Sequence, residues 1–70
     1  MNFSFNFYWR MKQDLPEAAY LKAFEIAKYL ETQPRRNWAD IIHQLCNHPE
    51  YSEGWGITIE NWFNYNLIWR

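Results

Sequence analysis

Residues 2–9 alternate between large rings and smaller or more polar side chains. Successive residues of a strand point to opposite faces of a sheet, so a period of two is typical of a half-buried strand. The pattern therefore predicts a strand over residues 2–9. One face would carry Phe3, Phe5, Phe7 and Trp9, and the other Asn2, Ser4, Asn6 and Tyr8.

After this segment the apolar positions change to the period of a helix. Asp14 can cap the helix, Pro16 is tolerated in the first turn, and Glu17 follows three residues after the cap. Apolar residues then recur every three or four positions. The helix should end near Thr32, because Pro34 pushes the residue before it away from helical angles.

A second helix is predicted from Asn37, which is a good cap, to about Asn47. Asp40 in its first turn suits the positive end of the helix dipole. A polar loop follows and closes on the sequence Gly54-Trp55-Gly56. The apolar stripe of the helix predicted over residues 37–47 consists of Trp38, Ile41, Ile42 and Leu45.

Residues 57–70 fit two structures. As a strand, six of the seven residues on one face are apolar. As a helix capped by Thr58, the segment has an apolar stripe that Asn66 interrupts. We expect a strand, because the strand at residues 2–9 needs backbone partners and no other stretch of the chain resembles a strand.

The expected fold is therefore a single small α+β domain over residues 1–70, in the order β-α-α-β, with two strands covered by two helices. The alternative is a mostly α fold in which the C-terminal segment is helical. An isolated two-stranded sheet is marginal in water and leaves two open edges. This predicted sheet would favour a partner, either a second copy in a homodimer or another protein.

The composition gives a second reason to expect a partner. The chain is 21% aromatic, with five Trp, five Tyr and five Phe. A chain this short buries only about 60% of the surface that its unfolded form exposes. Some rings should therefore remain exposed, and aromatic rings are enriched at the centres of protein interfaces.

We expect a non-catalytic protein–protein interaction module, specifically a small regulator or inhibitor that docks on a larger complex. Leu21 and Tyr29 lie on the polar side of the predicted first helix, where a monomer gains little from them. Glycines flank Trp55 and would let it project, or they would only form a turn. The candidate partner-binding residues are Tyr8, Leu21, Tyr29, Trp55 and Trp62.

His43, Cys46 and His48 are the only histidines and cysteine, and they fall within six residues. Zinc sites use such ligands, but a structural site needs four, and the chain has no second ligand pair. Cys46 lies near the predicted C-terminus of a helix, where the dipole disfavours a thiolate. We therefore expect no metal, no other cofactor and no catalysis by this group.

Single-stranded nucleic-acid binding is the alternative function. Its basic residues would be Arg10, Lys12, Arg35 and Arg36, if the end of the first strand meets the turn between the helices. Exposed rings can stack on unpaired bases. Against it, the net charge is −1 and the pI about 6.0. Residues 47–69 hold three acidic and no basic residues.

The sequence also predicts a location. No apolar run approaches the roughly 18 residues that a membrane span needs. The start of the chain lacks the charged and apolar regions of a signal peptide. A single cysteine cannot form an intrachain disulfide. We expect a cytoplasmic protein without a membrane partner.

Overall fold

The computed structural model describes residues 2–52 and 54–68, and every regular element in these ranges is helical. The predicted α+β fold with two strands is therefore wrong. The open sheet edges, which had suggested a partner, do not occur in the described residues. The elements are α1 (Phe5–Asp14), α2 (Glu17–Leu30), the 3-10 turn η1 (Arg35–Asn37), α3 (Trp38–Cys46), the single turn α4 (Pro49–Ser52), α5 (Gly56–Phe63) and the π-helical η2 (Asn64–Ile68).

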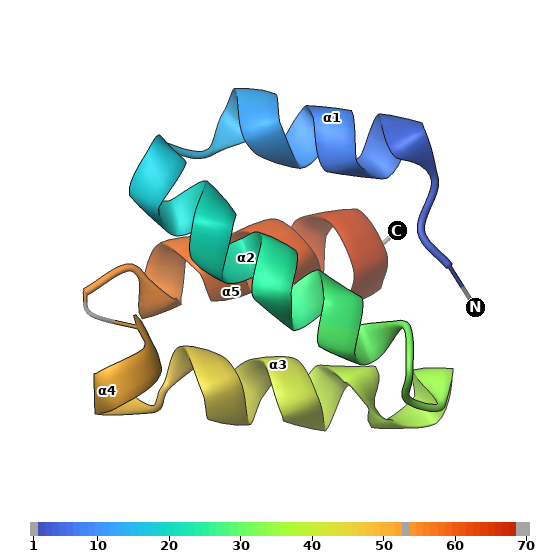
Figure 1. Cartoon of the computed structure of the whole chain (residues 1–70). Helices are drawn as coiled ribbons and strands as arrows, with labels where there is room; N and C mark the ends of the chain where they lie inside the picture. Colours follow the sequence, from blue (N-terminus) through green and yellow to red (C-terminus); the bar gives the residue numbers. More distant parts are fainter. Residues whose placement is uncertain (1, 53, 69–70) are drawn as a thin grey trace.

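The helices pack in three levels around one core (Figure 1). Helix α1 lies along one side and α3 along the other, with α2 and α5 between them. Helix α2 contacts α1, α3 and α5, and it contributes more buried residues to the core than any other helix, including Ala23, Ile26 and Leu30. No helix within the described ranges is long and apolar enough to cross a membrane.

Helix α1 replaces the first predicted strand because the same rings also fit a helical period. Phe3, Phe7 and Met11 are four residues apart, and all three belong to the core or pack against it. Phe5 and Trp9, which the strand would have placed beside them, are 80% and 52% exposed. The segment is therefore a helix rather than a strand, because only the helical spacing of its apolar side chains lets them pack against α2 and α5.

The start of α1 has a helix N-cap residue, Ser4, which the alternating pattern did not indicate. The Ser4 hydroxyl accepts a hydrogen bond from the backbone N–H of Phe7 at 3.2 Å, which is the geometry of a helix N-cap. No glycine or proline interrupts the ten residues of α1. The segment therefore has both a cap and an unbroken run of residues that a helix accepts.

The two predicted helices are confirmed as α2 and α3. Helix α2 begins at Glu17 and ends at Leu30, and α3 begins directly after Asn37. Asp14 does not cap α2, because it is the last residue of α1 and its carboxylate accepts a hydrogen bond from the Trp62 indole N–H at 2.8 Å. That bond joins α1 to α5.

The second predicted strand is also wrong, and the helical alternative is correct in its secondary structure. Its cap is not, because α5 (Gly56–Phe63) begins after Trp55 and Thr58 lies within the helix. Ile59, Trp62 and Phe63 are spaced three and four residues apart, and all three are buried. Asn66, which interrupts the helical stripe, donates its side-chain amide to the Trp62 carbonyl at 2.8 Å. Asn66 lies in the π-helical η2, so its amide satisfies a carbonyl near the end of the helix.

Glu31 holds the start of the chain against the end of α2. One carboxylate oxygen accepts hydrogen bonds from the Phe3 backbone N–H and the Tyr8 hydroxyl, each at 2.9 Å. The other lies 3.1 Å from the Lys28 ammonium. Burial favours the neutral acid, but the bonds from Phe3, Lys28 and Tyr8 outweigh it and lower the pKa of Glu31. The carboxylate therefore acts as an ionised clamp on α1.

Candidate interaction surface

Six ring-bearing or aliphatic side chains form one continuous surface over α1 and α2, which we call the aromatic surface. Helix α1 contributes the exposed Phe5 and Trp9 and the half-buried Tyr8. The Tyr8 ring lies 5.1 Å from that of Phe24, and the rings of Phe24 and Tyr20 lie 6.0 Å apart, so contacts cross from one helix to the other. The aromatic surface comprises Phe5, Tyr8, Trp9, Tyr20, Leu21 and Phe24.

Two hollows indent the aromatic surface, and Lys12 lines both. The first has a volume of about 270 Å³ and lies among Phe5, Tyr8, Trp9, Lys12 and Tyr20. The second has a volume of about 360 Å³ and lies among Lys12, Leu15, Glu17, Tyr20 and Leu21. The first hollow therefore has apolar and aromatic walls with the Lys12 ammonium group at its edge, whereas the second is lined by both Lys12 and the carboxylate of Glu17.

The base of the aromatic surface is fixed by Tyr8. Its hydroxyl donates to the Glu31 carboxylate, and the Lys28 ammonium lies 5.9 Å from the centre of its ring. Burial, together with the neighbouring carboxylate, raises the pKa of Tyr8, so the phenol remains a donor at physiological pH. Because Tyr8 is held in place, a partner that binds here need not order it.

Two of the five predicted partner-binding residues, Tyr8 and Leu21, lie in the aromatic surface. Tyr29 is 50% exposed, but it follows Leu21 by eight residues on α2, which is about 12 Å along a helix axis. Phe5 and Trp9 were not predicted as binding residues, because the alternating pattern placed both on one face of a strand with Phe3 and Phe7. The helical period of residues 5–14 would have identified them.

The other two predicted residues, Trp55 and Trp62, pack inward. Trp55 is half-buried against the core, directly after a turn in which Gly54 adopts a positive φ of 91°. The glycines thus serve the turn rather than the projection of the ring. Trp62 is only 8% exposed, and its N–H is bonded to Asp14. Neither offers an exposed ring to a partner.

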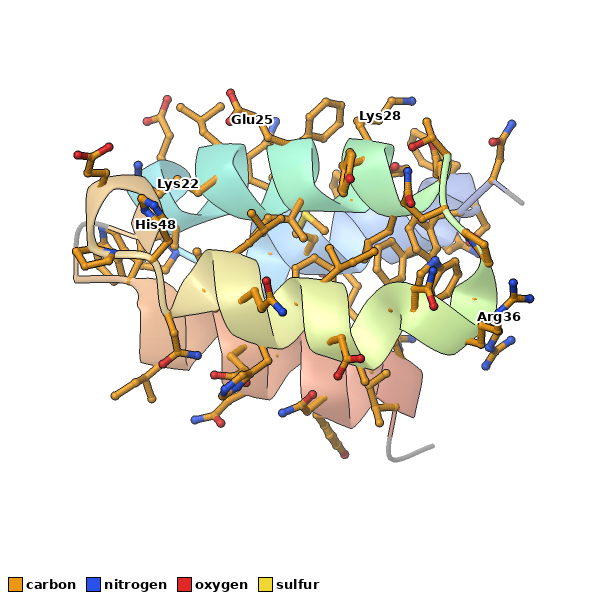
Figure 2. The ribbon with its side chains drawn as sticks, turned by 90° about the horizontal axis from the view of Figure 1, so that it is seen from below. Lys22, Glu25, Lys28, Arg36 and His48 are labelled. Atoms are coloured by element: carbon orange, nitrogen blue, oxygen red, sulfur yellow. The ribbon has the colours of Figure 1, made fainter. Side chains whose placement is uncertain are left out.

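The histidines and the cysteine do not converge. His43 lies 2.8 Å from Glu60, and Asn47 donates to the same carboxylate at 3.1 Å. Cys46 faces the core, whereas His48 is exposed in the loop before α4 (Figure 2). Across residues 2–52 and 54–68, no group of three His, Cys, Asp or Glu side chains is placed to hold a metal ion.

The Cys46 thiol should react slowly. Burial, with a smaller contribution from Glu60, raises its pKa to about 12, so the thiolate is scarce at neutral pH. We expect the folded protein to react with a disulfide reagent at least about a hundredfold more slowly than a cysteine peptide. The urea-unfolded chain is the control and should match the peptide. Equal rates for folded and unfolded protein would contradict a buried thiol.

The four basic residues of the nucleic-acid alternative lie in two separate places. Arg10 and Lys12 belong to α1, and Arg35 and Arg36 belong to η1 at the opposite edge of the molecule (Figure 1). Arg35 stacks over the Trp38 ring at 5.6 Å. The predicted meeting of a strand end with the interhelix turn does not occur, because α1 carries Arg10 and Lys12 away from η1.

A further hollow, of about 660 Å³ and larger than the two on the aromatic surface, lies between α1 and the C-terminal helical segment. Several of its polar groups are already bonded to one another: Asp14 accepts from Trp62, and Asn66 accepts from Arg10 at 3.5 Å. The aromatic surface is the more apolar of the two, so it is the stronger candidate. The large hollow is lined by Arg10, Asp14, Leu15, Thr58, Asn61, Trp62, Tyr65 and Asn66.

Comparison of the chain with protein-family models, with curated proteins and with solved structures finds no match. The interpretation of the aromatic surface therefore depends on its geometry and chemistry.

Proposed function

We propose that the protein is a non-catalytic protein–protein interaction module, a small regulator or inhibitor that docks on a larger protein through the aromatic surface. The observation that carries this proposal is the exposure of Phe5 and Trp9 beside the half-buried rings of Tyr8 and Tyr20. Contiguous apolar patches on small proteins mark interaction sites. Tryptophan and tyrosine are also over-represented among the residues that dominate binding energy.

The polar groups of α3 support a non-catalytic role. The Cys46 thiol is buried and stays protonated, so it is a poor nucleophile. The imidazole of His43 is engaged by Glu60 and Asn47 at the surface. A single free thiol is also consistent with a reducing compartment, and we place the protein in the cytoplasm.

Replacing Trp9 with alanine tests the docking role. Trp9 is half-exposed, so the variant should fold like the wild type, but it loses an exposed ring that lines the first hollow. We expect its affinity for the partner to fall by at least about tenfold. The measurement is capture of binding proteins from an extract of the native host, with quantification by mass spectrometry and confirmation of the purified pair by calorimetry.

Tyr65→Ala is the matched control, because Tyr65 is an exposed ring outside the aromatic surface. It should retain the partner that Trp9→Ala loses. Sedimentation over a range of concentrations tests whether that partner is a second copy, since a homodimer would then dissociate in the Trp9 variant. The proposal fails if Trp9→Ala retains every wild-type binding partner.

A further inference from the structure

Lys12 is the one basic residue among those that line the two hollows of the aromatic surface. It lines both hollows and is exposed. Within residues 2–52 and 54–68 it forms no hydrogen bond or ion pair. Lys28, by contrast, is paired with Glu31. A carboxylate that approaches from the first hollow would therefore meet an ammonium group between aromatic walls, on the side of Lys12 away from Glu17.

The first half of the chain holds most of the basic residues. Six of the seven basic residues lie in residues 1–36, together with four of the eight acidic residues. The remainder of the chain has four acidic residues and one basic residue. Arg35 and Arg36, at the opposite edge of the molecule, account for this excess. Residues 2–34, which carry the aromatic surface, hold four basic and four acidic residues, so the attraction for a carboxylate rests on Lys12 itself.

We propose that the aromatic surface binds an acidic amphipathic segment of another protein. A carboxylate of that segment pairs with Lys12. The two large apolar side chains that flank this carboxylate in the segment enter the two hollows, one in each. This inference rests on the proposed docking function and specifies the chemistry of the partner. Side chains three or four residues apart on a helix share one face, so a helical segment can present this arrangement.

A second copy of the chain and a nucleic acid would each fit the charges of the aromatic surface less well than an acidic peptide. In a two-fold dimer over this surface, the Lys12 ammonium groups of the two copies would repel each other wherever they lie near the symmetry axis. For a nucleic acid, Glu17 lines the second hollow and would repel phosphate. A peptide can place its carboxylate on Lys12 and keep apolar atoms near Glu17.

A library of short displayed peptides, selected on purified protein, tests the proposal. The wild type should enrich peptides in which Asp or Glu is flanked by Leu, Phe or Trp within one helical turn. Lys12→Glu should reverse the preference to Lys or Arg at that position. The best wild-type peptide, resynthesised, should bind Lys12→Glu about tenfold more weakly, because attraction becomes repulsion.

Arg36→Glu is the matched control, because it makes the same change of charge at an exposed residue of η1, which projects from one end of the molecule (Figure 2). It should leave the selected peptides and their affinities unchanged. A reduction equal to that of Lys12→Glu would show that net charge alone is responsible, and would overturn the pairing with Lys12.

The remaining outcomes separate this inference from the docking function. Enriched peptides that require Trp9 but show no acidic preference would overturn the partner chemistry and leave the docking function standing. A selection that enriches no peptide, or only peptides indifferent to Trp9→Ala, would count against both. Salt-sensitive binding of oligo(dT) that Lys12→Glu abolishes, without acidic peptides, would assign the surface to nucleic acid instead.

Discussion

Replacing Phe63 with alanine is expected to remove about 3–5 kcal/mol from the free energy of unfolding. Phe63 is fully buried on α5, and its ring lies 5.4 Å from that of Trp62 and 6.4 Å from that of Phe7. Deleting it leaves a cavity where α5 meets α1. Domains of this size are stable by only about 3–10 kcal/mol, so the variant should lose a large part of its stability and unfold at a much lower urea concentration. Urea unfolding followed by circular dichroism measures the loss.

The control for this substitution is Ile57→Ala, on the same helix. Ile57 is 76% exposed, so its replacement should change the free energy of unfolding by no more than about 0.5 kcal/mol. Comparable losses for the two variants would contradict the packing of α5, because they would show that the buried and exposed sides of this helix are not those described.

Replacing Glu31 with alanine is expected to cost about 2 kcal/mol at neutral pH. The substitution deprives the Phe3 N–H and the Tyr8 hydroxyl of their acceptor and Lys28 of its counter-charge. The stability should be measured by thermal unfolding. Glu50→Ala, at an exposed position in α4, is the control and should change it little.

The contribution of Glu31 to the free energy of unfolding should be lost in acid. Its pKa is lower in the folded protein than in the unfolded chain, because Phe3, Lys28 and Tyr8 stabilise the carboxylate. The contribution is therefore complete above the pKa of an ordinary glutamate, about 4.3, and is lost as the pH falls through the lower folded value. The wild type and Glu31→Ala should converge in acid. A difference that persists there would contradict an ionised clamp.

The sequence was sufficient to predict α2 and α3 but not the two ends of the chain. In α2 the buried residues fit only the helical period. At the ends, large apolar side chains are frequent enough that both the strand period and the helical period find apolar residues. Phe3, Phe5 and Phe7 alternate, yet Phe3, Phe7 and Met11 also follow a helix. The packing that decides between them comes from α2 and α5, which a local pattern does not contain.

The candidate surface was predictable to a similar extent. Leu21 stands out because an aliphatic residue on the polar side of a helix has no core to enter. Trp62 was misjudged, because its indole partner, Asp14, lies 48 residues earlier in the chain. Phe5 and Trp9 were missed together with α1, since a wrong secondary structure assigns each ring to the wrong side.

The helical state of α1 also bears on aggregation. As an extended strand, this segment would have offered unpaired backbone N–H and C=O groups at its edge and a face of alternating rings to identical chains. Cross-β fibrils grow by stacking such strands. In the helix, these backbone groups bond within the segment, and the rings split between the interior and the surface. The protein can thus display Phe5 and Trp9 to a partner without also presenting a template for fibril growth.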